Sequence, residues 1–310
     1  MVQEEGTLKP KEQPVIWFQT ASCSGCSVSV LNTVSPSIKN VLVDEVVPGT
    51  HVNLRFHPTV MAGQGEPALE VLEETAVHKK GKYVLVVEGA IPTGEEGAFG
   101  SVGEREETPI PMTEQVENLA RDALAVVALG SCAAYGGIPA AAPNPTRAMG
   151  VQEFLAARDL KTPVINVPGC PTHPDWFVGT LSHLLLFGPF QPEELDEIGR
   201  PKAFYGKLIH DNCPRRAYFE VGKFAKHFGE EGCLYELGCR GPITYADCPL
   251  RHWNGGANWC IDSGSPCIGC VEPDFFDLVP LYERLGEESI LVLRRDAETS
   301  KLRVGRWEAE

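Results

Sequence analysis

The stretch Cys260-Ile-Asp-Ser-Gly-Ser-Pro-Cys267-Ile-Gly-Cys270, preceded by Cys248, shows what this chain is organised around. Glycine, serine, proline and tryptophan separate the four cysteines, and no apolar period there would build a helix or a strand. Such a loop has little to hold it in one shape unless a bound centre ties its thiols together. Soft thiolate ligands select zinc or iron–sulfur clusters. The stretch therefore predicts that the chain folds around a bound metal centre.

Upstream of this stretch, apolar runs alternate with helical periods. Runs rich in β-forming residues predict strands at 14–19, 52–56, 83–87, 125–129 and 163–167. Helices are expected from about 28, and over 66–78, 113–124, 151–158 and 176–186. Leu69, Val71, Leu72 and Val77 are expected on the buried side of the 66–78 helix. This alternation predicts an α/β fold with a doubly wound parallel sheet.

A first group of cysteines follows three of the predicted strands. Cys23 and Cys26 come after the first strand, Cys132 after the fourth and Cys170 after the fifth. Ligands of such sheets bind beyond the carboxyl ends of the strands, so we expect these four thiols to meet at one edge. The alternative for Cys132 and Cys170 is a buried core thiol, which free cysteine often is.

A second group offers one imidazole and three thiols. His210-Asp-Asn-Cys213 and Cys233-Leu-Tyr-Glu-Leu-Gly-Cys239 carry its members. His227 and His252 are alternatives to His210, but the offset of His210 from Cys213 suits a shared centre. A neutral histidine ligand raises a cluster's potential relative to a fourth thiolate.

The third group is Cys248, Cys260, Cys267 and Cys270. Zinc also uses sets of four cysteines, or of three cysteines and one histidine, so spacing alone leaves zinc open for the second and third groups. Three groups of four ligands in one chain favour a series of iron–sulfur clusters that conduct electrons. The chain has no dinucleotide fingerprint, phosphate loop or nucleophile elbow. Glu66 and Glu88 could move protons, but each is explained as a helix-start or strand-end carboxylate.

Composition limits the partners and the compartment. The formal charge of −15 argues against nucleic acid or an anionic membrane surface. Eleven cysteines are an odd number in a chain too long to need a disulfide framework. No apolar run approaches a transmembrane segment. Residues 1–13 lack a signal core and a twin-arginine motif, which predicts a cytoplasmic protein, although an exported protein whose leader had been removed would look the same.

Two domains are expected from the change of character along the chain. Residues 1–190 hold the predicted sheet and the first group, and residues 191–310 hold the other two groups. The segment 187–200, rich in proline and acidic residues, is the expected linker. A strand-like piece occurs at 290–293 in the tail.

Six motifs together closely resemble the small subunit of nickel–iron hydrogenases, over residues 14–277. They are Trp17-Phe-Gln19 with Cys23-Ser-Gly-Cys26-Ser-Val-Ser29, Val87-Glu-Gly-Ala-Ile-Pro92, Gly130-Ser-Cys-Ala-Ala-Tyr-Gly-Gly137, Val167-Pro-Gly-Cys-Pro-Thr-His-Pro-Asp-Trp176, Asn258-Trp-Cys260 and Cys267-Ile-Gly-Cys-Val-Glu-Pro-Asp-Phe275. The resemblance implies a flavodoxin-like domain, and electron transfer for reversible H2 oxidation at a nickel–iron site in a large subunit. It also implies an external carrier such as a cytochrome or ferredoxin.

The resemblance implies a ligand set for each of three clusters. A proximal 4Fe–4S cluster would use the first group, and a distal one the second. Most relatives hold a medial 3Fe–4S cluster and have proline where this chain has Cys260. A fourth cysteine there is similar to the nickel–iron–selenium branch and implies a medial 4Fe–4S cluster, with 3Fe–4S as the alternative. Two rivals are a quinone-reductase-like cluster subunit, which would not need the C-terminal groups, and a zinc scaffold without enzymatic activity.

Overall fold

The computed structural model describes residues 11–34, 37, 40, 45–47, 50–277 and 280–284. The strand-like piece at 290–293 and the first ten residues of the polar N-terminus lie outside these ranges.

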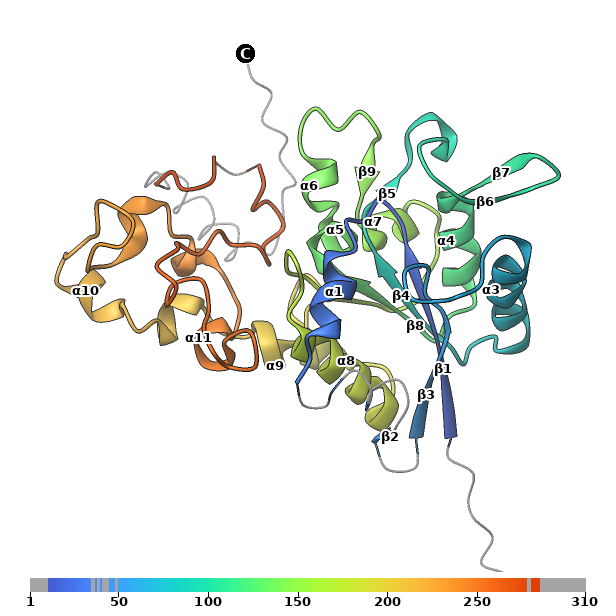
Figure 1. Cartoon of the computed structure of the whole chain (residues 1–310), viewed down its shortest axis with the longest axis horizontal. Coiled ribbons are helices and arrows are strands. Elements are labelled where there is room, and N and C mark those ends of the chain that lie inside the picture. The colour runs from blue at the N-terminus through green and yellow to red at the C-terminus, as the bar shows by residue number, and fades with distance from the viewer. Residues whose placement is uncertain are drawn as a thin grey trace, which may run out of the picture.

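A six-stranded sheet forms the centre of the N-terminal part of the molecule (Figure 1). In spatial order its strands are β10 (Val164–Val167), β8 (Ala125–Leu129), β4 (Val84–Glu88), β1 (Lys11–Gln19), β3 (Thr50–Phe56) and β2 (Glu45–Val47). The first five run parallel, and β2 pairs antiparallel with β3 at the edge. The five predicted strands and the α/β fold class are therefore confirmed. The chain reverses its winding between β1 and β4, which is where doubly wound sheets form their binding crevice.

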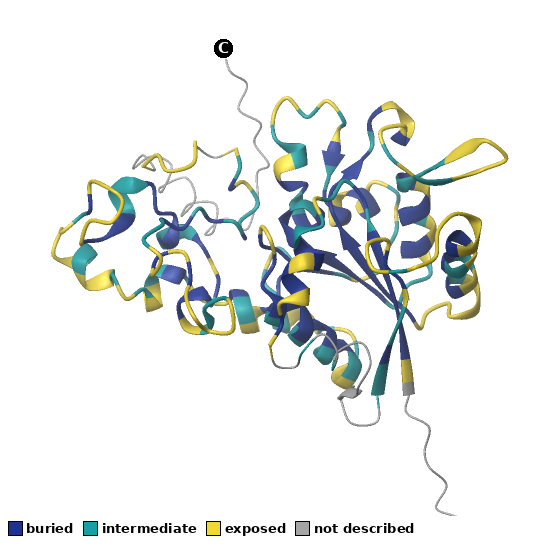
Figure 2. Ribbon diagram, viewed as in Figure 1, coloured by how far each residue is buried: buried dark blue, intermediate teal, exposed yellow. Residues whose placement is uncertain are grey.

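Strand β4 is buried on both of its faces. Val84 and Val86 pack into one hydrophobic core, and Leu85 and Val87 pack into the other. All four side chains are completely buried, as the dark blue strands in Figure 2 show. Because such a strand is buried on both faces, its sequence is a continuous run of apolar residues, and its position could therefore be predicted.

Helices cover both faces of the sheet (Figure 1). One face carries α1 (Gly25–Leu31) and α8 (Pro174–Phe187), and the other carries α3 (Glu66–His78), α4 (Met112–Arg121), α5 (Gly130–Tyr135) and α7 (Val151–Ala156). The prediction for α3 holds for Leu69 and Leu72, but Val71 is only half-buried. The prediction for Val77 is wrong, since this side chain is 70% exposed. It lies on the outward side of α3 with the exposed Glu70 and Glu74, whereas Thr75, two residues earlier, is still buried against the core.

Several short elements around the sheet have no counterpart among the predicted ones. They are β5 (Ile91–Pro92), paired with β9 (Ala148–Met149), the hairpin of β6 (Ser101–Arg105) and β7 (Thr108–Pro111), and α6 (Gly137–Ala140). Each is too short for its hydrophobic period to be read.

Beyond residue 200 the chain forms short helices joined by loops. They are α9 (Lys202–Tyr205), α10 (Arg216–Glu220) and α11 (Cys248–Arg251), with 3-10 turns at Ile209–Asn212, Leu234–Leu237 and Gly241–Ile243. Isolated bridges are the only β-pairing found there in the described residues. This part lies beside the sheet and contains its own buried residues (Figure 2). Its regular structure is too sparse to hold the loops without further cross-links.

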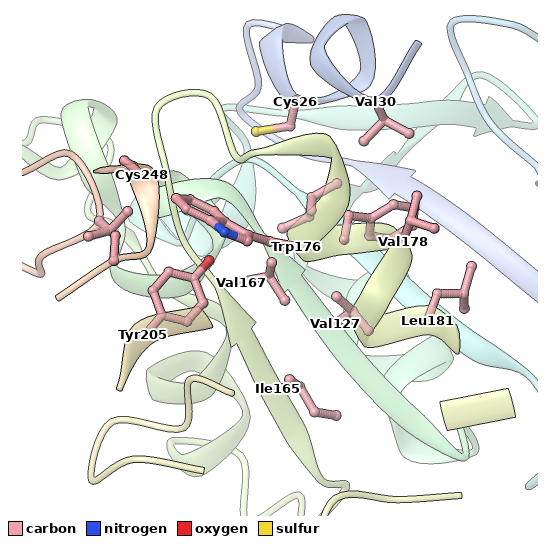
Figure 3. Close-up of a cluster of buried hydrophobic side chains, with 14 of the residues drawn as sticks. Cys26, Val30, Val127, Ile165, Val167, Trp176, Val178, Leu181, Tyr205 and Cys248 are labelled. Atoms are coloured by element: carbon pink, nitrogen blue, oxygen red, sulfur yellow. The ribbon is translucent and has the colours of Figure 1, made fainter. Parts of the chain in front are cut away.

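Buried contacts join this C-terminal part to the sheet. The Trp176 indole Nε1 of α8 donates a hydrogen bond to Asp247 Oδ1 at 2.7 Å. The Tyr205 hydroxyl donates to the carbonyl of Pro168 at 2.9 Å. Trp176 and Tyr205 pack in the cluster that also contains Cys26 and Cys248 (Figure 3).

The end of the segment 187–200 is hydrogen-bonded to the sheet. The Asn166 side chain of β10 donates to the Ile198 carbonyl at 2.6 Å, and the Asn166 amide donates to the Gly199 carbonyl at 2.9 Å. The division into domains at residue 190 stays a prediction.

Candidate iron–sulfur sites

The first group of cysteines lies at the carboxyl edge of the sheet. Cys23 follows β1 and Cys26 lies in α1, whereas Cys132 lies in α5 and Cys170 follows β10. Burial, with smaller contributions from the thiols of Cys170 and Cys23, raises the pKa of Cys132 to about 11. Burial also raises the pKa of Cys26, with contributions from Glu88, Cys132 and Cys23. Three separate loops thus bring four thiols close enough to affect one another's ionisation.

Glycines leave room for the sulfur atoms of this group. A Cβ atom on Gly130 would lie 2.5 Å from Cys26 Sγ, and one on Gly137 would lie 3.0 Å from Cys132 Sγ. Both glycines have positive φ, +85° and +52°, where an L side chain is strained. The backbone therefore approaches these sulfurs as closely as only glycine permits.

Glu88 at the end of β4 holds the start of α1. It is 2% exposed and accepts hydrogen bonds from Trp17 Nε1 at 2.9 Å, Gln19 Nε2 at 3.0 Å and the Ser27 hydroxyl. The backbone amides of Cys26 and Ser27 also donate to it, both at 3.2 Å. Helix α1 has no side-chain N-cap of its own, so a carboxylate from another strand satisfies its first amides. Glu88 is thus more than a strand-end carboxylate, because it fixes the helix that carries Cys26.

The second group lines one cavity in the C-terminal part. The cavity is lined by His210, Cys213, Cys233 and Cys239, together with apolar neighbours including Ile209, Leu234 and Ile261. Burial, with smaller contributions from Cys213 and Cys233, raises the pKa of Cys239 to about 11. Neither His227 nor His252 lines the cavity. The structure therefore brings together the four residues of the predicted set.

The third group surrounds the start of α11. Burial raises the pKa of Cys248, and the Cys270 and Cys260 thiols raise it further. Cys267 is buried, and its pKa is raised by burial and by Cys239, Cys270 and Cys248. Cys260 is exposed, so one of the four cysteines of this group lies at the surface.

Hydrogen bonds connect the third group to each of the other two. The Arg240 amide, next to Cys239, donates to the Cys267 carbonyl at 2.7 Å. The Ser131 hydroxyl, next to Cys132, also donates to the Cys270 carbonyl. The three groups therefore lie in the order first, third, second, which the order along the sequence does not give.

The donors are of types that both zinc and iron–sulfur clusters use. In the described ranges, no group of three His, Cys, Asp or Glu side chains forms a site for a single metal ion. Thiols with raised pKa values are protonated without metal, and ligation would replace those protons. The chemistry of the donors, eleven thiols and one imidazole, fits iron–sulfur clusters.

Two arginines near these groups are buried, which the sequence did not predict. Arg200 is 4% exposed, with Nε 2.7 Å from Asp196 Oδ2 and Nη1 3.2 Å from Glu272 Oε1. Arg240, next to Cys239, is 1% exposed. Arginine is usually exposed, so no local pattern could mark these two as buried. The position of Arg240 beside a predicted ligand was the only available hint.

Comparisons with known proteins agree with this geometry. A family described as the C-terminal part of the NiFe/NiFeSe hydrogenase small subunit matches residues 205–282, which contain the second and third groups. A family described as "NADH ubiquinone oxidoreductase, 20 Kd subunit" matches residues 23–184. That second match stops before the two C-terminal groups, which is how the quinone-reductase rival was expected to differ.

Individual relatives match most of the chain. The periplasmic [NiFeSe] hydrogenase small subunit of Desulfomicrobium baculatum is 49% identical, over 86% of this chain and 85% of its own length. The periplasmic [NiFe] hydrogenase small subunit of Solidesulfovibrio fructosivorans is 42% identical, over 89% and 84%. A crystal structure of the reduced, active Ni-Fe-Se hydrogenase from Desulfomicrobium baculatum superposes with a TM-score of 0.83 at 48% identity, covering 89% of this chain and 100% of that one. This chain therefore belongs to the family of small subunits of NiFe/NiFeSe hydrogenases, which carry iron–sulfur clusters and pair with the large subunit that holds the active site.

Proposed function

We propose that this chain conducts electrons through three 4Fe–4S clusters, between the nickel–iron site of the large subunit and an external carrier. Cys23, Cys26, Cys132 and Cys170 would hold the proximal cluster. Cys248, Cys260, Cys267 and Cys270 would hold the medial cluster, and His210, Cys213, Cys233 and Cys239 the distal one. When bound, such clusters take up and release single electrons.

The observation that carries this proposal is the contact between successive groups. The Ser131 hydroxyl, next to Cys132 of the first group, donates to the carbonyl of Cys270 of the third, and the Arg240 amide, next to Cys239 of the second group, donates to the carbonyl of Cys267 of the third at 2.7 Å. Each contact joins the neighbour of a ligand of one proposed cluster to a ligand of the next. These contacts support the order proximal, medial, distal for electrons released by H2 oxidation.

The exposed edge of the first group suits it to face the large subunit. Cys23 and Cys170 are exposed, whereas Cys233 and Cys239 of the second group are buried. At the other end of the proposed route, His210 replaces one thiolate. A neutral ligand there raises the distal potential, which favours electrons leaving toward the carrier.

Cys260 supports a medial cluster of the 4Fe–4S type over 3Fe–4S. Its thiol raises the pKa values of both Cys248 and Cys270, so it lies near the rest of the third group. A fourth thiolate supplies a ligand for a fourth iron. The added negative charge should lower the medial potential and ease electron flow toward proton reduction.

The compartment and the carrier follow from the relatives and the charge. Two relatives are named periplasmic, which supports the alternative of an exported protein over a cytoplasmic one. No helix within the described ranges has the length and apolarity to cross a membrane. The formal charge of −15 favours a basic carrier, such as a cytochrome, over an acidic ferredoxin.

Anaerobic purification of the complex with its large subunit tests the proposal. Metal and acid-labile sulfide analysis should give about thirteen iron and about twelve sulfide per complex, with twelve of the iron atoms from three 4Fe–4S clusters and one from the nickel–iron site. Addition of H2 should reduce the clusters, seen by paramagnetic resonance. Zinc without sulfide would support the scaffold instead, and iron for only one cluster would contradict the assignment of the two C-terminal groups.

A further inference from the structure

His173, at the start of α8, is hydrogen-bonded to the segment that follows Cys248 of the third group. Its Nε2 lies 2.7 Å from the carbonyl oxygen of His252, which is 79 residues further along the chain. The His252 amide in turn donates to the carbonyl of Cys248 at 2.9 Å. His173 therefore reaches a residue of the third group through a single intervening residue.

The segment that carries His173 is held against the first group. Thr172, the residue before it, comes two residues after Cys170 and is completely buried. The Thr172 carbonyl accepts a hydrogen bond from the Ser29 hydroxyl of α1 at 2.7 Å, and α1 also contains Cys26. The imidazole of His173 thus connects a segment fixed beside the first group to a segment fixed beside the third.

The hydrogen-bond partners of the His173 ring determine which of its nitrogens carries the proton. A backbone amide only donates, so Nδ1, which lies 3.1 Å from the Asp175 amide, must be the acceptor. A carbonyl oxygen only accepts, so Nε2 must donate to His252. One neutral ring therefore serves as the N-cap of α8 and as the donor of the link to the third group.

Packing and backbone conformation fix both ends of this link. His173 is 4% exposed, and its ring centroid lies 4.7 Å from that of Trp253 and 5.4 Å from that of Trp176. His252 has a φ of +58° and a ψ of −176°, close to a region that is essentially restricted to glycine. Such a conformation persists only where the surroundings hold it, and the hydrogen bond from His173 is one of the contacts that do so.

We propose that His173 is a positioning residue that fixes the separation between the proposed proximal and medial clusters. This inference rests on the proposed function. Electron tunnelling between two clusters depends steeply on their separation. A link that holds Cys248 at a constant distance from the segment after Cys170 keeps this step uniform from one molecule to the next.

Two substitutions in the purified complex separate the two roles of the ring. His173→Asn places an oxygen near the position of Nδ1, so it keeps the cap of α8 but is too short to reach the His252 carbonyl. His173→Gln places an amide nitrogen near the position of Nε2, so it keeps the donor and loses the cap. His183→Asn is the matched control, because His183 lies in the same helix and its Nε2 is 3.0 Å from Glu194, which belongs to none of the three groups.

The measurement is the magnetic interaction between the reduced proximal and medial clusters, obtained by pulsed paramagnetic resonance, together with iron content and denaturant unfolding. We expect His173→Asn to keep its iron but to lose the single, well-defined interaction of the wild type, because the separation then varies. His173→Gln and His183→Asn should keep the wild-type interaction, although the free energy of unfolding of His173→Gln should fall because the cap is lost. A role as N-cap alone predicts the reverse, with the interaction altered in His173→Gln and unchanged in His173→Asn.

A wild-type interaction in a His173→Asn complex with full iron content would overturn the proposal, and so would an equal loss of the interaction in His183→Asn. If His173→Asn does not assemble its clusters, His173→Gln decides the question: the wild-type interaction there supports the proposal, and its loss contradicts it. If neither variant assembles clusters, His173 is needed for folding and the proposal is wrong. Absence of cluster signals from the wild-type complex would instead contradict the proposed function itself.

Discussion

Replacing Gly130 by alanine should remove the proximal cluster while leaving the other two in place. The added Cβ would lie 2.5 Å from Cys26 Sγ. Favourable contact between such atoms begins at about 3.5 Å, so the sulfur must move by about 1 Å. Metal ligands tolerate displacements of only about 0.2 Å. The required shift is several times larger than ligation allows.

The surroundings of Cys26 leave it little freedom to adjust. Its amide and that of Ser27 are held by Glu88, and the Ser29 hydroxyl donates to the Thr172 carbonyl at 2.7 Å. The new alanine would also keep a φ near +85°, which costs about 1–2 kcal/mol. With about 1–3 kcal/mol for overpacking, the free energy of unfolding should fall by about 2–5 kcal/mol.

Gly81→Ala provides the matched control. Gly81 also has a positive φ, +68°, but a Cβ there would meet no atom within 4 Å. This variant should lose only the strain term of about 1–2 kcal/mol and keep all its iron. Iron and sulfide analysis, paramagnetic resonance of the reduced complex and denaturant unfolding are the measurements. Gly130→Ala should lose about one third of the iron, together with the proximal signal.

Full iron content and an unchanged proximal signal in Gly130→Ala would refute the reasoning, because Cys26 would then not need its present position to act as a ligand. Equal iron loss in both glycine variants would show that backbone strain alone is responsible.

Three further outcomes are expected. Cys260→Pro should convert the medial cluster to 3Fe–4S and raise its reduction potential, because a ligand and an iron are lost. If paramagnetic resonance of the oxidised variant shows no new 3Fe signal, this would count against Cys260 as a ligand. Trp176→Phe removes the hydrogen bond to Asp247 and should lower the free energy of unfolding, measured with denaturant, by about 1.5–3 kcal/mol. A change below about 0.5 kcal/mol would mean that this contact does not join the two parts of the molecule. Removing iron with an oxidant and a chelator should make the chain beyond residue 201 sensitive to protease before the sheet is cut, because the helices of that region are short. Protection of the region beyond residue 201 without iron would show that it folds without clusters.

Much of the fold could be predicted because its signals are local. The buried parallel strands β1, β4, β8 and β10 are continuous apolar runs, and the helices between them have clear periods. Val77 shows the limit of this reasoning. The apolar residues of α3 fit more than one side of the helix, and the side that is buried carries Leu69, Leu72 and Thr75, not Val77.

The site divides in the same way. Local spacing alone suggested that Cys23 and Cys26 share a centre, and that His210 and Cys213 share another. Which segments complete each group depends on how strands and loops meet in space. Glu88 is 62 residues from the Cys26 amide that it holds, and its role as the cap of α1 had no sequence signal.

By itself, the sequence determined the class of the sheet, the family and the residue types that could bind clusters, since these depend on periodicity, motif and side-chain chemistry. Only the tertiary structure decided that the third group lies between the first and the second, and that Arg240 is buried beside two of them. Those facts depend on contacts between residues far apart in the chain, such as Ser131 with Cys270, and a local pattern carries no information about such contacts.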